Sequence, residues 1–269
     1  MQIWNEEKCI VGEGVLFDSR TDTVWFLDIR GKRLYKSHYP TGKYETIELP
    51  QQVGCMALCE NGRVLAAMED GVYWVDTLEK AHQDIAIKGR RFNDGKVGPD
   101  GAFYLGTVDA DGKGAFYRLK DGTLTELFDG CTCSNGLDWT ADGKQMYYID
   151  TPKRMVELFD FENGQLSNRR CFAKIPAETG KPDGMTLDSR GDLWVALWDG
   201  SGVLHIDSAG NILEKIELPC KRVSCCAFGG ENLETLFITS AAFEEPSPGA
   251  GKTYYCKPGV SGNPIFYYK

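Results

Sequence analysis

The sequence has no hydrophobic run long enough to cross a membrane. Its longest apolar stretch, Leu193–Trp198, covers only six residues, whereas a spanning helix needs about 20. Residues 1–8 also lack the basic start and long apolar core of a secretory signal. We therefore expect no membrane contact and a cytoplasmic location.

An excess of positive charge is also missing. The 30 Lys and Arg residues are outnumbered by 39 Asp and Glu residues, which gives a net charge of -9 at pH 7. Nucleic-acid phosphates are bound by clustered basic side chains, so this balance argues against a nucleic-acid partner. It suits a cation or a neutral polar substrate, but most acidic proteins are acidic simply because charge keeps them soluble.

Histidine is scarce, and the familiar cysteine motifs are absent. His38, His82 and His205 are the only histidines, and none of them begins a predicted inner strand. A histidine-rich zinc site or a Ser-His-Asp triad is therefore not indicated, and no Gly-x-Ser-x-Gly motif occurs. The ten cysteines include no Cys-x-x-Cys pair, so we expect reduced thiols in the core rather than a disulfide framework.

Helical periodicity is missing as well, and a strand pattern repeats in its place. Six segments follow one another at intervals of about 40 to 48 residues, and each contains a short apolar strand, a turn and a strongly apolar second strand. They open at Glu13, Gly54, Asn93, Asn135, Asp183 and Ser224. Further strands follow in each unit, as in residues 115–119 and 124–128.

This repeat predicts an all-β fold, a six-bladed β-propeller with four-stranded antiparallel blades around a central channel. A two-sheet sandwich is the alternative, which the regular unit length disfavours. We expect residues 1–269 to form one propeller domain. We also expect the N-terminal strand, within residues 3–10, to join the last blade near residues 265–268 and close the ring.

Four of the six units open with a polar residue that stands one or two positions before a glycine. These residues are Glu13, Asn93, Asn135 and Asp183. The first strand of each blade lines the channel, so the four side chains should meet at one mouth. Carboxylate and amide oxygens suit calcium, magnesium or manganese. Any one of them alone is more simply a turn former or strand cap, but four in the same register favour a shared site.

Connectors between the second and third strands should return to the same mouth. The residues they offer as further lining are Asp28, Glu69, Asp109, Asp150, Trp198, Asp199 and Phe243.

The repeated motifs resemble those of the SMP-30/gluconolactonase/regucalcin-like propellers, in order and over nearly the whole chain. The matching segments are Gly12-Glu13-Gly14, Arg91-Phe92-Asn93-Asp94-Gly95-Lys96, Ser134-Asn135-Gly136-Leu137-Asp138-Trp139, Tyr147-Tyr148-Ile149-Asp150, Pro182-Asp183-Gly184-Met185, Leu193-Trp194-Val195-Ala196 and Ser224-Cys225-Cys226-Ala227-Phe228-Gly229-Gly230. The resemblance implies that Glu13, Asn135 and Asp183 are divalent-metal ligands. It also implies that Arg91 and Asn93 contact the substrate, with Asn93 near the metal.

The resemblance further implies hydrolysis of a small sugar-acid lactone to the free aldonic acid. In this scheme one divalent metal, Ca²⁺ first and Mn²⁺, Zn²⁺, Mg²⁺ or Fe²⁺ as alternatives, polarises the lactone carbonyl. Asp183 is our choice of general base. The connector at Asp109 is shorter than the lid of regucalcin-like relatives, so the pocket should be more open. We expect a monomer or a weak homodimer.

Two other functions remain open from the sequence. One is a calcium-binding regulatory protein of the regucalcin type without essential enzymatic activity. The other is a propeller that serves as a protein-interaction platform, although Trp-Asp and Gly-His signatures are missing.

Overall fold

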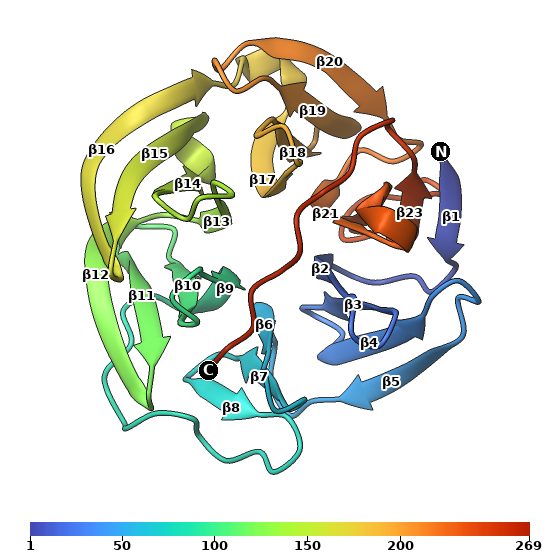
Figure 1. The fold of residues 1–269 in the computed structure, drawn as a ribbon. Helices are drawn as coiled ribbons and strands as arrows, with labels where there is room; N and C mark the ends of the chain where they lie inside the picture. The colour runs from blue at the N-terminus through green and yellow to red at the C-terminus, as the bar shows by residue number, and fades with distance from the viewer.

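Six small antiparallel sheets surround a central axis in the computed structural model, which describes residues 1–269 (Figure 1). Five sheets have four strands and one has three. In each sheet one strand lies next to the axis and the following strands lie progressively farther out. The predicted six-bladed β-propeller is therefore confirmed.

The first three blades are formed by residues 12–131. Their strands are β2 (Gly12–Asp18), β3 (Thr23–Asp28), β4 (Arg33–His38) and β5 (Tyr44–Glu48); β6 (Cys55–Leu58), β7 (Val64–Ala67) and β8 (Val72–Trp74); and β9 (Arg91–Val97), β10 (Phe103–Val108), β11 (Gly114–Lys120) and β12 (Thr123–Cys131). The second blade has three strands instead of the expected four, because the chain after β8 makes only an isolated bridge between Tyr73 and Lys80.

The other three blades contain the rest of the chain. Their strands are β13 (Ser134–Trp139), β14 (Gln145–Asp150), β15 (Met155–Glu162) and β16 (Gln165–Lys174); β17 (Lys181–Leu187), β18 (Leu193–Trp198), β19 (Gly202–Ile206) and β20 (Ile212–Glu217); and β21 (Val223–Gly229), β22 (Thr235–Ser240), β23 (Thr253–Cys256) and β1 (Gln2–Asn5). Short 3-10 turns occur at η1 (Thr151–Lys153), η2 (Ala177–Thr179) and η3 (Glu231–Leu233), and no helix is long and apolar enough to cross a membrane.

The N-terminal strand closes the ring, as predicted, but its partner differs from the expected one. β1 pairs antiparallel with β23 in the sixth blade, and not with residues 265–268. Pro264 has no N–H to offer a ladder, which disfavours a strand at that point. Residues 263–268 instead cross the channel (Figure 1), and Tyr268 forms a parallel bridge with Cys59 in the second blade.

The core lies between neighbouring blades. Every residue of β3 and β22 is buried, whereas the outer strand β5 is mostly exposed. This gradient explains why the second strand of each repeat is apolar on both faces. Between the third and fourth blades, the fully buried ring of Phe116 lies 5.0 Å from Phe128 and 5.1 Å from Tyr148, measured between ring centroids.

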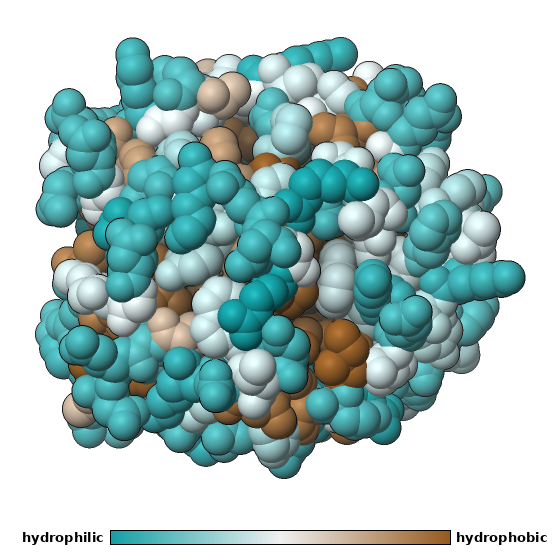
Figure 2. Space-filling model, turned by 60° about the horizontal axis from the view of Figure 1, so that its bottom comes forward, coloured by the Kyte–Doolittle hydropathy of each residue, from teal (hydrophilic) through white to brown (hydrophobic).

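Figure 2 shows a face on which hydrophilic side chains predominate and hydrophobic residues emerge in small areas between them. A large exposed apolar patch would mark a protein-interaction surface. This face therefore gives no support to an interaction platform.

The aromatic cluster between the third and fourth blades allows its contribution to the free energy of unfolding to be tested. Phe116→Ala should lower the free energy of unfolding by about 3–5 kcal/mol, because it removes a fully buried ring and leaves a cavity. Urea denaturation followed by tryptophan fluorescence measures this loss. Phe266→Ala is the control, since that ring is 36% exposed and its removal should cost clearly less. Equal losses for the two variants would contradict this assignment of the core.

Candidate functional site

The inner strands carry a shared irregularity at the predicted ligand positions. Pairing with the second strand shifts register between Glu13 and Leu16 in β2, between Ser134 and Leu137 in β13, and between Pro182 and Met185 in β17. Such β-bulges bend a strand and re-aim a side chain. In these three repeats the register shift therefore lies at the polar residue and the glycine that follows it.

The glycines of these bulges have a steric reason. A Cβ on Gly136 would lie 2.6 Å from the backbone oxygen of Asp183, so β13 and β17 can approach this closely only without a side chain there. Gly14 adopts a φ of +57°, in the left-handed region that favours glycine. In each of these motifs the polar residue supplies a side chain to the channel. The glycine after it allows the close approach or the backbone conformation that the bulge requires.

The structure brings the five residues predicted for the site to one cavity. Glu13, Arg91, Asn93, Asn135 and Asp183 all line a cavity of about 300 Å³. Four of the five are buried, and Arg91 is partly exposed. The remaining lining residues are Val11, Ile29, Arg30, Cys133, Thr151, Lys181, Trp198 and Phe243.

A chain of hydrogen bonds fixes the amide side chains across three blades. Arg91 Nη1 donates to Asn93 Oδ1 at 2.8 Å, and Asn93 Nδ2 donates to Asn135 Oδ1 at 3.0 Å. Asn135 Nδ2 then donates to Thr151 Oγ1 at 2.7 Å, which donates to the backbone oxygen of Pro182 at 2.8 Å. Asn135 Oδ1 keeps a lone pair for a further partner, because an amide oxygen can accept two bonds.

The carboxylate of Asp183 has no hydrogen-bond donor in the structure, although the residue is only 6% exposed. Glu13 accepts one backbone N–H, from Gly14 at 2.8 Å. Buried carboxylates with so few donors are costly unless a cation compensates them. The donor set of two carboxylates and an amide oxygen therefore fits a hard divalent cation.

The electrostatics of the cluster lead to the same conclusion. Burial raises the pKa of Glu13 to about 8, and the negative charge of Asp94 adds to this effect. Burial also raises the pKa of Asp183 well above its ordinary value, with repulsion from Glu13 and Asp94 as further causes. A bound cation would reverse these shifts, since it stabilises the ionised form.

Comparison with known proteins decides the family. The model of the SMP-30/Gluconolactonase/LRE-like region matches residues 11–242. The chain belongs to this family. Regucalcin of Danio rerio is 35% identical, and the match covers 98% of this chain and 96% of that protein. A candidate sugar lactone lactonase of Bacillus subtilis (strain 168), YvrE, is also 35% identical, over 91% of this chain and 90% of its own length.

Solved structures agree with this membership. A calcium-binding protein, regucalcin, from Agrobacterium tumefaciens str. C58 superposes with a TM-score of 0.92 at 26% identity, covering 100% of this chain and 97% of that one. A gluconolactonase from Xanthomonas campestris superposes with a TM-score of 0.78 at 24% identity, covering 95% of this chain and 88% of that one, and this likeness shows the shared fold. The resemblance drawn from the motifs is confirmed at the level of the family.

The connector residues divide into two groups in this family member. Trp198 and Phe243 line the cavity as expected, and Glu69 lines an adjoining one. Asp28 and Asp150 are instead buried acceptors for backbone N–H groups, of Val11 and Cys133 among others.

The other two connector acids take part in local contacts outside the cavity. Asp109 accepts N–H bonds inside its own turn. Asp199 forms ion pairs with Lys181 and Arg222. These acids therefore hold the connectors in shape.

One charged residue of the channel was not predicted from the sequence to belong to the site. Asp94 is buried next to Asn93, and burial raises its pKa to about 6. Its charge acts on both Glu13 and Asp183. The doublet Asn93-Asp94 before Gly95 was the available signal, because a bulge places two consecutive residues opposite one.

A second group of potential ligands lies elsewhere in the fifth blade. One ligand atom from each of Asp188, Asp192 and His205 lies within 4.8 Å of the others. All four carboxylate oxygens there already accept a hydrogen bond, including those from Trp194 Nε1 at 3.0 Å and from Ser208 N–H at 3.0 Å. These three side chains could hold a metal by proximity, but the carboxylate oxygens of Asp188 and Asp192 have partners without one, unlike those of Asp183.

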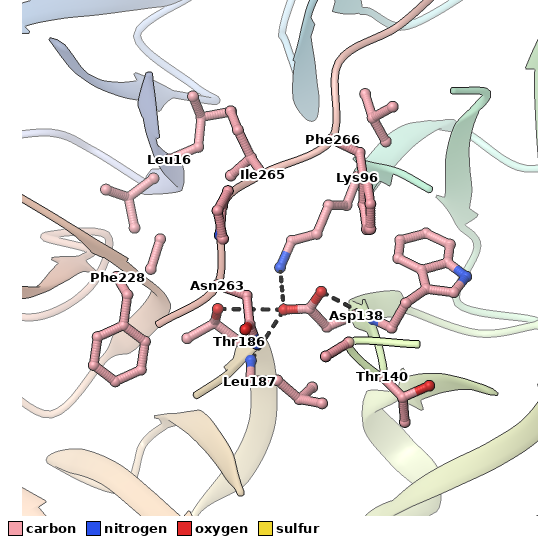
Figure 3. Close-up of a pocket in the computed structure, with 16 residues that line it drawn as sticks. Leu16, Lys96, Asp138, Thr140, Thr186, Leu187, Phe228, Asn263, Ile265 and Phe266 are labelled. Carbon is pink, nitrogen blue, oxygen red and sulfur yellow. Dashed lines mark hydrogen bonds and ion pairs between the residues drawn. The ribbon is translucent and has the colours of Figure 1, made fainter. Parts of the chain in front are cut away.

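At the other end of the channel, side chains and the C-terminal tail surround a separate cavity. Lys96 Nζ donates to Asp138 Oδ2 at 2.9 Å, and the same oxygen accepts the N–H of Leu187 at 3.0 Å. Figure 3 shows this ion pair in a cavity of about 260 Å³, beside the tail residues Asn263, Ile265 and Phe266. The space between the two ends is only about 40 Å³.

The buried carboxyls predict an unusual pH dependence for the metal-free protein. Because the folded pKa of Glu13 is about 8 and its ordinary value is 4.5, the folded state holds a proton that the unfolded chain has lost. Stability should therefore fall as the pH rises from about 5 to about 8. Thermal unfolding in EDTA measures this fall, and saturating calcium should reduce it.

The Asp183→Asn variant is the matched control. It removes one buried carboxyl, so its unfolding temperature in EDTA should fall less steeply with pH and should exceed that of the wild type at pH 8 by about 2 °C or more. A wild-type protein that becomes more stable across this range in EDTA would contradict the electrostatic description.

Proposed function

We propose that this protein is a metal-dependent lactonase that hydrolyses a sugar-acid lactone to the free aldonic acid. One observation supports this most directly: the unpartnered carboxylate of Asp183 lies in a cavity with Glu13, Asn135 and the guanidinium group of Arg91. An oxygen-ligand set beside a hydrogen-bond donor is suited to an oxygen-rich substrate with a reactive carbonyl. The kinship with a candidate sugar lactone lactonase adds to the proposal.

Glu13, Asn135 and Asp183 would hold the metal. When bound, a divalent cation supplies Lewis acidity that polarises a carbonyl and stabilises the oxyanion formed on attack. The Asn93 contact orients Asn135 Oδ1, and Thr151 fixes the other end of the same amide. The orientation of the Asn135 ligand is thus set by bonds within the protein before any substrate arrives.

Asp183 would act as the general base. Its carboxylate takes a proton from the attacking water and returns it to the ring oxygen that leaves as an alkoxide, so no net proton is consumed at the side chain. No protein group donates a hydrogen bond to the Asp183 carboxylate, so its oxygens are not already used by the protein's own donors. Neighbouring Glu13 has a backbone donor, which favours a fixed role as ligand.

Arg91 and two aromatic residues would position the sugar. Arg91 Nη1 is used by the backbone oxygen of Phe92 and by Asn93 Oδ1, and the other guanidinium N–H groups have no partner. They can therefore donate to substrate hydroxyls or ring oxygen. Trp198 and Phe243 give the cavity an apolar wall, which suits the C–H groups of a sugar ring.

The activity test is a panel of aldonolactones assayed with Ca²⁺, Mn²⁺, Mg²⁺, Zn²⁺ or Fe²⁺ and after treatment with EDTA. We expect turnover that EDTA abolishes and metal restores. Asp183→Asn should lower kcat by about 10²–10⁴-fold, because it removes the base and weakens a metal ligand. Asp142→Asn, in an exposed turn of the fourth blade, is the control and should behave as wild type. Activity of Asp183→Asn within twofold of wild type would refute the proposed role.

The second candidate is calcium binding without an essential activity, favoured by the names of the regucalcin relatives. Calcium titration calorimetry together with the lactone panel separates the two. Tight calcium binding without turnover of any lactone would favour the second candidate.

A further inference from the structure

A second cavity adjoins the candidate metal site at the same mouth of the channel. It measures about 670 Å³ and shares Arg30, Arg91 and Cys133 with the inner cavity. The other residues that line it are Gln52, Glu69, Arg90, Val108, Ala110 and Thr132. A substrate bound at the inner cavity would therefore extend into this outer one.

Arg30, Arg90 and Arg91, which line the outer cavity, form no ion pair, although the charge of Glu13 acts on Arg91 from the inner cavity. Seven of the twelve arginines in the chain form ion pairs with carboxylates, but these three do not. The guanidinium groups of Arg30 and Arg90 also form no hydrogen bond within the protein. In a chain with a net charge of -9, where carboxylates outnumber basic groups, three unpaired arginines at one opening are a local exception.

The one acid in the outer cavity does not neutralise them. Glu69 forms no ion pair with any of the three, and its Oε1 accepts the backbone N–H of Gln52 at 3.3 Å. With three guanidinium groups and one carboxylate, the outer cavity has an excess of positive charge.

Two of the arginines are held in position. The guanidinium carbon of Arg30 lies 3.7 Å from the centre of the Phe243 ring, a cation–π contact, and Arg91 is fixed by its bonds to Phe92 and Asn93. Burial lowers the pKa of Arg91; the charge of Glu13 opposes this effect, and the charge of Arg30 adds to it. An anion between these groups would relieve that repulsion, and the planar fork of arginine matches the oxygens of a carboxylate or phosphate.

We propose that the outer cavity binds an anionic group of the substrate, so that the preferred substrate is an acidic sugar lactone. The lactone carbonyl would lie at the inner cavity, and a carboxylate or phosphate at the remote end of the sugar would lie among Arg30, Arg90 and Arg91. This inference rests on the proposed lactonase function and narrows its substrate class.

The kinetic test compares kcat/KM for three lactones on the metal-loaded protein. These are D-glucono-1,5-lactone, which is neutral, its 6-phosphate, and D-glucaro-1,4-lactone, which carries a carboxylate. We expect at least one of the anionic lactones to be preferred by about tenfold or more at low salt, with the preference declining as NaCl is added. The anion that is preferred identifies the group for which the cavity is built.

Arginine variants locate the effect. Arg30→Gln and Arg90→Gln should each reduce the preference for the anionic lactone several-fold, chiefly through KM. Arg190→Gln, an exposed arginine without an ion pair in the turn between β17 and β18, should keep the wild-type preference. A neutral lactone hydrolysed as well as both anionic ones would overturn the inference and leave the lactonase proposal intact.

A binding measurement keeps the inference testable if no lactone is hydrolysed, an outcome that would count against the lactonase proposal itself. Calorimetry compares 6-phospho-D-gluconate and D-glucarate with D-gluconate, which lacks the remote anion. Tighter binding of either, lost in Arg30→Gln and Arg90→Gln, would support the anion site. Equal binding of all three would overturn it.

Discussion

Repulsion between buried carboxylates is the constraint on which the rest of this structure depends. Glu13, Asp94 and Asp183 come from three different blades. The charge of Asp94 raises the pKa of Glu13, and the charges of Glu13 and Asp94 raise the pKa of Asp183. Nothing in their local sequence would hold like charges together in a place with few donors. They stay close because the ring of blades, closed by the pairing of β1 with β23, leaves the inner strands no freedom to separate.

Packing of the blades therefore sustains an arrangement that is locally unfavourable. The apolar second strands and the aromatic contacts between blades supply stability, and the glycines of the bulges let the inner strands approach closely. Active sites commonly retain such unfavourable features because the surrounding fold compensates for them. In this protein the compensation is spread over the whole ring rather than confined to the neighbours of the site.

Much of this organisation could be predicted from the sequence, because the same strand pattern occurs six times. The propeller fold and the convergence of Glu13, Asn93, Asn135 and Asp183 follow from aligned strand openings, and the family follows from the resemblance of the motifs to those of known members. The partner of the N-terminal strand could not be predicted, since both β23 and the tail offered apolar residues and only the absent N–H of Pro264 separated them. Asp94 was missed because its role depends on a bulge, and bulges are set by pairing between strands.

The role of Arg30 and Arg90 in the outer cavity could not be predicted for a related reason. Arg30 and Arg90 lie in connectors of different blades, and a lone arginine in a loop is ordinarily a solvated charge. They stand out because they form no ion pair with a carboxylate. Whether an arginine is paired depends on its neighbours in the folded structure, which the sequence does not show. Composition pointed the other way, since a net negative chain suggests a cation or a neutral substrate.

The C-terminal tail and the Lys96–Asp138 pair narrow the channel at the end away from the site. A substrate that enters by the mouth would then leave most easily by the same opening. The product of any reaction there would occupy this opening before the next substrate could arrive. Turnover would then depend on how quickly a charged product escapes past the arginines at the rim, and the affinity of that rim would be limited by the need for release.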